Sequence, residues 1–319
     1  MKQIFCTIGP ASLNKNFLNS VKKKVSLLRI NLSHVGLKEL PKTINFLKKN
    51  SKIPICIDTE GAQIRTKVFK EKYYKKNSKI VIKNQINNKD LYFYPDIFNQ
   101  IKINDIFDIG FEGLKIKITQ IKSNSIQSKV ISEGVLSSNK GVHLTNRRIK
   151  LNYLTEYDFK AIELAKNLGI KNFALSFTNS LDDVKKFNKL LKNKRKIFKI
   201  ESKKAIQNLG KIIKEADEFI IDRGDLSKEI TIEEIPVIQR YILKKLNKKR
   251  KKVFIATNLL ESMIVNRYPT RAEANDIYNC LELGSTGLVL AAETAIGRWP
   301  SECVDFISKI ITKFRKLNN

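Results

Sequence analysis

The sequence predicts a (β/α)8 barrel, the parallel eight-stranded TIM barrel, with a small antiparallel β domain inserted after the third strand. Short apolar runs alternate with amphipathic stretches almost to the end of the chain. The alternation breaks once, between residues 67 and 143. A chain of 319 residues is long enough for a large barrel that carries such an insertion.

The predicted barrel strands are short runs rich in Ile, Val, Leu and Phe. In chain order they are QIFCTI (3–8), VSLLRI (25–30), IPICID (53–58), NFALSF (172–177), RKIFKI (195–200), DEFIID (217–222), KVFIAT (252–257) and TGLVLA (286–291). Segments with helical periodicity follow most of them, such as LTEYDFKAIELAKNLG (154–169) and TRAEANDIYNCLELG (270–284). A last helix over 300–319 is expected to close the barrel.

The interval from 67 to 143 has a different pattern. It contains alternating segments such as SKIVIK (78–83), LKIKITQIK (114–122) and SIQSKVIS (125–132), separated by Asn, Gly and Ser. Alternation with a period of two is typical of strands. We therefore expect residues 1–66 and 144–319 to form the barrel and residues 67–143 to form the inserted β domain.

Composition excludes several classes of protein. With 42% hydrophobic residues, 13 Gly and 7 Pro, the chain is neither disordered nor fibrous. Its four cysteines lie far apart and it has two histidines, so neither a zinc site nor a disulfide framework is expected. The N-terminal apolar run is too short for a signal peptide and no run is long enough to span a bilayer, so we expect a cytoplasmic protein with no membrane partner.

The formal net charge of +30 raises the question of nucleic-acid binding. The excess is mostly lysine, spread over segments such as VKKKV, LKNKRK and KKLNKKRKK, without the interleaved aromatic residues that single-strand binders use. A solvated lysine-rich surface is the favoured interpretation, and no nucleic-acid partner is expected. The positive field can still attract anionic substrates.

The run IFKIES (197–202) places Lys199 and Glu201 at the end of a buried strand. Side chains two residues apart on a strand point to the same face, so the ammonium and the carboxylate project together. A buried salt bridge and a catalytic pair at the mouth of a barrel both explain this pattern.

Function in such barrels lies at the C-terminal ends of the strands, and those ends are strongly polar here. The charged residues found there are Arg29, Asp58, Arg65, Lys199, Glu201 and Asp225. Clustered opposite charges fit an anionic substrate held together with a divalent metal, and Glu201 and Asp225 are the predicted metal ligands. The backbone N–H groups at Gly224 and Asp225 are also predicted to bind a carboxylate or a phosphate. Arg29 and Arg65 suit phosphate because a guanidinium group can bond two oxygens at once.

The chain resembles a known family, the pyruvate kinases. The motifs that carry the resemblance, in order, are FCTIGPAS, LLRINLSH, CIDTEGAQIRT, NKGVHLT, FKIES, DRGDL, ATNLLESMIVNRYPTRAEAND and LAAETAIGRWP. The resemblance implies a barrel, a mobile β-barrel lid after strand three, and transfer of the phosphoryl group of phosphoenolpyruvate to ADP in glycolysis. The family's C-terminal effector domain is expected to be absent, and with it activation through that domain. A homodimer through barrel contacts remains possible.

The resemblance also implies roles for individual residues. Lys199 would neutralise charge on the phosphoryl group and the enolate, and Thr257 would lie near the carbon that is protonated. Arg29 and Arg65 would bind the phosphoryl group and are implied as catalytic residues with Lys199 and Thr257. Substrate contacts are implied for Arg29, Lys199, Gly224, Asp225 and Thr257. Magnesium or manganese would be bound by Glu201 and Asp225. Potassium would be bound by Asn31, Ser33, Asp58 and Thr59. Nucleotide contacts are implied for Asn31, His34, Arg65 and Lys140.

Several positions depart from the family pattern. Glu60-Gly61-Ala62-Gln63 stands where the family has Lys-Gly-Pro-Glu. That glutamate is linked to potassium dependence, so Gln63 leaves the dependence on potassium open. Asp222 replaces a small residue, Ser227 a glycine and Asn258 a glutamine.

These departures keep a second function open, a degenerate homologue that binds phosphoenolpyruvate or nucleotide in a regulatory role without turnover. A different metal-dependent barrel enzyme acting on pyruvate enolates is a third possibility.

Overall fold

The computed structural model of the chain describes residues 2–85, 90–110 and 113–318. Asn319, which the predicted final helix includes, lies outside this description. The chain forms two compact units, one made of Met1–Gly61 with Tyr153–Asn319 and the other of Ala62–Asn152. The predicted domain boundaries at 67 and 143 fall within strands of the second unit.

The first unit is a closed barrel of parallel strands in the order β1-β17-β16-β15-β14-β13-β3-β2. Its strands are β1 (Gln3–Thr7), β2 (Leu27–Asn31), β3 (Ile55–Asp58), β13 (Asn172–Leu175), β14 (Arg195–Ile200), β15 (Glu218–Asp222), β16 (Lys252–Ala256) and β17 (Gly287–Leu290). Each lies within one of the eight runs predicted from sequence or extends one residue beyond it. The predicted (β/α)8 class is therefore confirmed.

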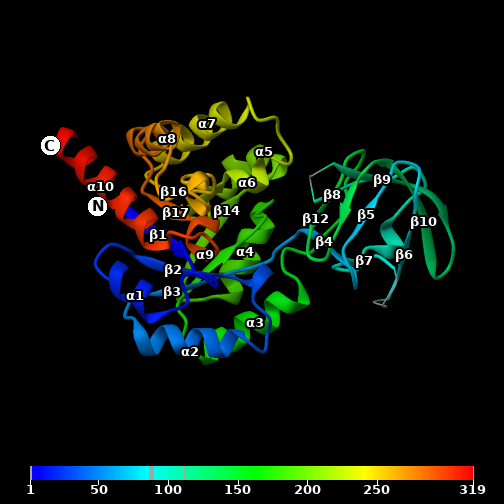
Figure 1. The fold of residues 1–319 in the computed structure, drawn as a ribbon, viewed down its shortest axis with the longest axis horizontal. Helices are drawn as coiled ribbons and strands as arrows, with labels where there is room; N and C mark the ends of the chain where they lie inside the picture. The colour runs from blue at the N-terminus through cyan, green and yellow to red at the C-terminus, as the bar shows by residue number, and fades with distance from the viewer. Residues whose placement is uncertain (1, 86–89, 111–112, 319) are drawn as a thin grey trace. The chain divides into compact units, whose positions relative to one another are not determined.

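Helices surround these strands (Figure 1). They are α1 (Lys15–Val21), α2 (Leu40–Asn50), α3 (Glu156–Asn167), α4 (Leu181–Leu190), α5 (Lys203–Ile212), α6 (Arg223–Leu226), α7 (Ile235–Lys248), α8 (Arg271–Glu282), α9 (Ala292–Ala295) and α10 (Pro300–Asn318), with short 3-10 turns η1 (Leu32–His34) and η3 (Glu261–Ile264). The main apolar core fills the layer between helices and strands.

The inside of the barrel has its own apolar layer. It consists of Phe5, Leu27, Cys56, Ala174, Ile197, Ile220, Phe254, Ala256 and Val289, with the rings of Phe5 and Phe254 stacked 4.2 Å apart. Because strand side chains alternate, the residue two positions further along each strand faces the same interior. On six of the eight strands that residue is polar, namely Thr7, Arg29, Asp58, Ser176, Lys199 and Asp222. The interior thus changes from apolar to polar toward the C-terminal ends of the strands.

A buried aspartate fastens the loop that follows β3. Thr155 and Asp158 form a capping box at the start of α3. The Asp158 carboxylate also accepts hydrogen bonds from the backbone N–H groups of Glu60, at 2.7 Å, and Gly61, at 3.0 Å. Burial raises the pKa of Asp158 despite these hydrogen bonds. The loop after Asp58 is therefore held by a carboxylate in the first turn of α3.

The second unit is built from antiparallel strands. Its main sheet has the order β6-β10-β9-β8-β12-β4-β7, and an isolated bridge between Ile82 and Leu91 brings its ends close to closure. The strands are β4 (Ile64–Lys67), β6 (Lys79–Lys83), β7 (Tyr92–Tyr94), β8 (Ile106–Ile109), β9 (Leu114–Ile121), β10 (Ser125–Ser132) and β12 (Gly141–Leu144), with β5 (Lys72–Tyr74) and β11 (Gly134–Leu136) as a separate pair and the turn η2 (Phe98–Gln100). The predicted antiparallel β-barrel insertion is confirmed.

Within the described ranges, no helix combines the length and the apolar character needed to cross a membrane.

Gly61 tests the packing of the loop after β3. Its φ is +68°, and a Cβ added there would lie 2.5 Å from the Ser176 carbonyl oxygen. Gly284, with φ +89°, is a matched control because its Cβ would meet the movable side-chain amide of Asn247. In both variants an alanine must adopt a left-handed backbone conformation. Only in Gly61→Ala does the new Cβ also clash with a backbone atom, the Ser176 carbonyl oxygen. We expect Gly61→Ala to lower the free energy of unfolding by at least about 1 kcal/mol more than Gly284→Ala in urea titrations. Equal losses would contradict this packing.

Candidate active site

Lys199 lies at the centre of the charged rim. It is 4% exposed, and its ammonium is 3.0 Å from Glu201 Oε2, 3.1 Å from Asp222 Oδ2 and 3.5 Å from Asp58 Oδ2. It also donates to Ser176 Oγ at 3.3 Å. Burial alone would lower the pKa of Lys199, but the three carboxylates outweigh burial and raise it. The group is therefore a buried ammonium that holds its proton more strongly than an ordinary lysine does.

Arg29 provides the second buried cation. Its guanidinium is 3.0 Å from Asp58 Oδ2, and its Nε donates to the Thr7 hydroxyl at 2.9 Å. Asp58 also accepts from the Ser176 hydroxyl at 3.2 Å. Asp58 therefore connects the two cations of the barrel mouth.

Glu201 is fully buried and reaches the same cluster from the loop after β14. Its Oε1 accepts a 2.6 Å hydrogen bond from the backbone N–H of Phe177, a residue with φ +49°. Burial raises the pKa of Glu201, although Lys199 opposes the shift. A carboxylate with this environment gains from a further cation, because Lys199 and Arg29 carry two positive charges against three buried carboxylates.

Glu201, Asp222 and Asp225 form a candidate divalent-cation site. One oxygen of each carboxylate lies within 4.8 Å of the others. Asp225 also pairs with Lys228 at 2.7 Å. Burial would raise the pKa of Asp222, but Lys199 and Arg29 outweigh it and the pKa is lowered. Hard oxygen donors of this kind fit magnesium or manganese.

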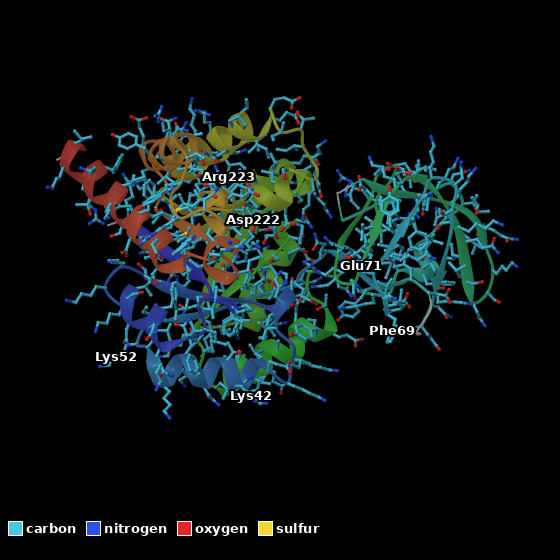
Figure 2. All side chains as sticks on the ribbon, in the orientation of Figure 1. Lys42, Lys52, Phe69, Glu71, Asp222 and Arg223 are labelled. Atoms are coloured by element: carbon cyan, nitrogen blue, oxygen red, sulfur yellow. The ribbon has the colours of Figure 1, made fainter. Side chains whose placement is uncertain are left out.

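Thr257 stands on a strained turn after β16. Thr257 and Asn258 have φ values of +68° and +52°. The Arg223 guanidinium holds this turn by donating to the carbonyl oxygens of Thr257, at 2.6 Å, and Asn258, at 3.0 Å, while it pairs with Asp276 at 2.6 Å. The Thr257 hydroxyl accepts from the Gly224 N–H at 2.7 Å. Figure 2 labels Asp222 and Arg223 at the point where β15 runs into α6.

The residues expected to bind a monovalent cation lie at the ends of two neighbouring strands. Asn31 on β2 is the register partner of Asp58 on β3, and its side chain accepts from the Ser33 N–H at 3.1 Å. Thr59 Oγ1 accepts from the Ser176 N–H at 3.1 Å. His34 ends the turn η1 that follows β2.

Arg65 and Lys140 belong to the inserted unit. Arg65 on β4 pairs with Gly141 on β12, directly after Lys140, and its guanidinium donates to the Asn139 carbonyl at 3.2 Å. Of these two predicted nucleotide contacts, Arg65 therefore lies on β4 and Lys140 directly precedes the neighbouring strand β12.

The sequence interpretation missed Ser176 and the Phe177 N–H. A sequence signal for Ser176 exists, because it directly follows the fourth barrel strand and is polar like the residues at the other strand ends. The Phe177 contact depends on a left-handed backbone conformation that no sequence pattern indicates. Asp222 was noted as a departure but not as a partner of Lys199.

The fold and this rim together define a (β/α)8 barrel enzyme. The chain matches the family model for the pyruvate kinase barrel domain over residues 1–304. It is 32% identical to a pyruvate kinase of Thermococcus litoralis, covering 97% of this chain and 68% of that protein, and 33% identical to one of Buchnera aphidicola, with 97% and 68% covered. The match to a Thermotoga maritima pyruvate kinase is 31%, covering 98% and 71%. The chain belongs to the pyruvate kinase family.

Family membership carries the function of a pyruvate kinase and dependence on a metal ion in general. It implies phosphoenolpyruvate and ADP as substrates. The two predictions made from sequence for family and for function are therefore confirmed.

Arg223 is expected to be essential for the turn that presents Thr257. Replacement by methionine removes hydrogen bonds to two carbonyl oxygens and leaves Asp276 without its guanidinium partner. We expect Arg223→Met to lower the free energy of unfolding by about 2 to 4 kcal/mol, measured by urea denaturation. Arg240→Met, which loses one exposed hydrogen bond to Pro236 on α7, is the control and should change it little. If Arg223→Met lowers the free energy of unfolding no more than Arg240→Met does, Arg223 does not stabilise the turn at Thr257.

Proposed function

We propose that this chain transfers the phosphoryl group of phosphoenolpyruvate to ADP, giving pyruvate and ATP, as a magnesium-dependent enzyme of the cytoplasm. The observation that carries the proposal is the buried Lys199 ammonium set among Asp58, Glu201 and Asp222 at the barrel mouth. Phosphoryl transfer needs positioning and charge neutralisation more than a protein nucleophile. The rim supplies two buried cations for that purpose.

In the proposed reaction, the bond between phosphorus and the enol oxygen breaks while a terminal phosphate oxygen of ADP bonds to phosphorus. Arg29 would hold phosphoryl oxygens through its guanidinium, and Lys199 would neutralise charge on the phosphoryl group and the departing enolate oxygen. The enolate then takes a proton on its methylene carbon and becomes pyruvate. Thr257 and the backbone at Gly224 would lie beside that part of the substrate.

Glu201 and Asp225 would hold magnesium or manganese, which when bound neutralises substrate carboxylate and phosphoryl oxygens. Asn31, Ser33, Asp58 and Thr59 would hold potassium. Asp58 is already bonded to Arg29, which supplies a fixed positive charge beside that site. The assay below therefore compares turnover with and without potassium.

Asn31, His34, Arg65 and Lys140 would contact the nucleotide. The pairing of β4 with β12 supports joint action of Arg65 and Lys140. A homodimer through barrel contacts is compatible with the proposal, and neither nucleic acid nor membrane is part of it.

The decisive assay couples pyruvate formation to lactate dehydrogenase, with phosphoenolpyruvate, ADP and magnesium, in the presence and absence of potassium. Lys199→Met should lower kcat by at least about 100-fold, because the charge it neutralises develops during transfer. Lys196→Met is the control, since Lys196 lies on the same strand and donates to the Leu191 carbonyl at 3.1 Å. It should retain most activity.

No pyruvate under any cation condition, together with intact ligand binding, would overturn the proposal in favour of a regulatory homologue. Removal of magnesium by a chelator should stop turnover, and restoration by manganese should recover it.

The pH profile offers an independent test of Lys199. The three carboxylates raise its pKa, so the ammonium keeps its proton to higher pH than an ordinary lysine does. At saturating substrate, kcat should show no fall caused by Lys199 between about pH 7 and 10. Lys199→Arg, which cannot lose its charge in this range, provides the reference profile. A fall in the wild-type profile that the arginine variant lacks would contradict the raised pKa.

A further inference from the structure

Asp222 contacts two of the residues expected to act on the substrate, Lys199 and Thr257. It ends β15, which lies between β14 and β16 in the barrel, and it is 4% exposed. Its Oδ2 is 3.1 Å from the Lys199 ammonium, and its Oδ1 is 3.3 Å from the Thr257 hydroxyl. One oxygen of Asp222 thus contacts Lys199 on β14, and the other contacts Thr257, which directly follows β16.

The other two carboxylates around Lys199 have competing partners. Asp58 is closer to Arg29, at 3.0 Å, than to Lys199, at 3.5 Å. Glu201 is 3.0 Å from Lys199 but is also one of the two proposed magnesium ligands. A cation bound to Glu201 would compete with the ammonium for the same carboxylate, and two adjacent positive charges repel each other. Asp222 belongs to the same three-carboxylate cluster. Its Oδ2 lies 3.1 Å from the ammonium, however, so it can pair with Lys199 while Glu201 and Asp225 hold the cation.

Resting on the proposed function, we propose that Asp222 is a positioning residue that keeps the Lys199 ammonium in place while a divalent cation occupies Glu201 and Asp225. The Thr257 hydroxyl lies 3.3 Å from the second oxygen of Asp222 and 2.5 Å from the Ala256 carbonyl oxygen, and it has one proton to donate. The ion pair with Lys199 is therefore the contact that orients the Asp222 carboxylate. Asp222 therefore supplies negative charge to the lysine and leaves Glu201 to the metal. It acts through Lys199 rather than on the substrate.

The kinetic test uses Asp222→Asn, which keeps the shape but removes the charge, and Asp222→Ala. Because Lys199 neutralises charge that develops during transfer, the loss should appear in kcat. We expect kcat to fall by about 10-fold or more in both variants, with the KM for phosphoenolpyruvate changed by less than about 3-fold, at saturating magnesium. Asp217→Asn is the matched control: Asp217 directly precedes the same strand at its other end and pairs with Lys251 on the surface.

A second measurement does not depend on turnover. Manganese binding to the substrate-free protein, followed by electron paramagnetic resonance, should weaken by about 5-fold in Asp222→Asn, because Lys199 then relies more on Glu201 and opposes the cation. Asp217→Asn should bind manganese as the wild type does. Circular dichroism and the unfolding midpoint show whether each variant is folded, and Asp222→Asn is the variant to interpret if Asp222→Ala unfolds.

The outcomes separate this inference from the proposed function. The inference stands when kcat and manganese affinity both fall. A weaker affinity with normal kcat at saturating metal overturns it. A loss of affinity far above 5-fold also overturns it, because Asp222 would then be a direct metal ligand, as its place in the three-carboxylate cluster allows. An unchanged affinity also overturns it. If the wild type makes no pyruvate, the proposed function fails while manganese binding still decides the role of Asp222.

Discussion

The structure depends on one constraint, the cost of removing the Lys199 ammonium from water. A charge buried at the end of a barrel strand is stable only when opposite charges and hydrogen bonds replace the solvent. Here Asp58, Glu201 and Asp222 supply the charge and Ser176 supplies a hydroxyl. Asp58 and Asp222 end the strands β3 and β15, whereas Ser176 and Glu201 directly follow β13 and β14, so a closed barrel is needed to assemble them.

The charged rim follows from the geometry of the strands that carry it. Apolar side chains such as Ile197 and Ile220 fill the barrel interior, and the residues two positions later, Lys199 and Asp222, face the same space nearer the mouth. The apolar layer below excludes water from the charges above it and gives them a firm base. On these strands, one inward-facing residue packs in the apolar core and the next inward-facing residue belongs to the charged site.

Two turns with a left-handed backbone conformation orient groups of the site. Phe177 has a left-handed conformation, and its N–H binds Glu201. The turn at Thr257 and Asn258 has the same kind of conformation and is held by Arg223. Such conformations cost about 1 to 3 kcal/mol each and persist only where surrounding contacts compensate. Both turns lie at C-terminal ends of barrel strands, where the proposed chemistry takes place.

The sequence by itself determined the eight strands, the inserted β unit and the family, because hydrophobic periodicity and long ordered motifs are local properties of the chain. It also indicated that Lys199 and Glu201 share a face, since strand alternation requires it. Only the tertiary structure showed that Asp222 and Ser176 contact Lys199, that Arg29 shares Asp58 with it, and that Phe177 caps Glu201. Those contacts join side chains of different strands, and their distances depend on barrel closure and on backbone conformations that residue type alone does not specify.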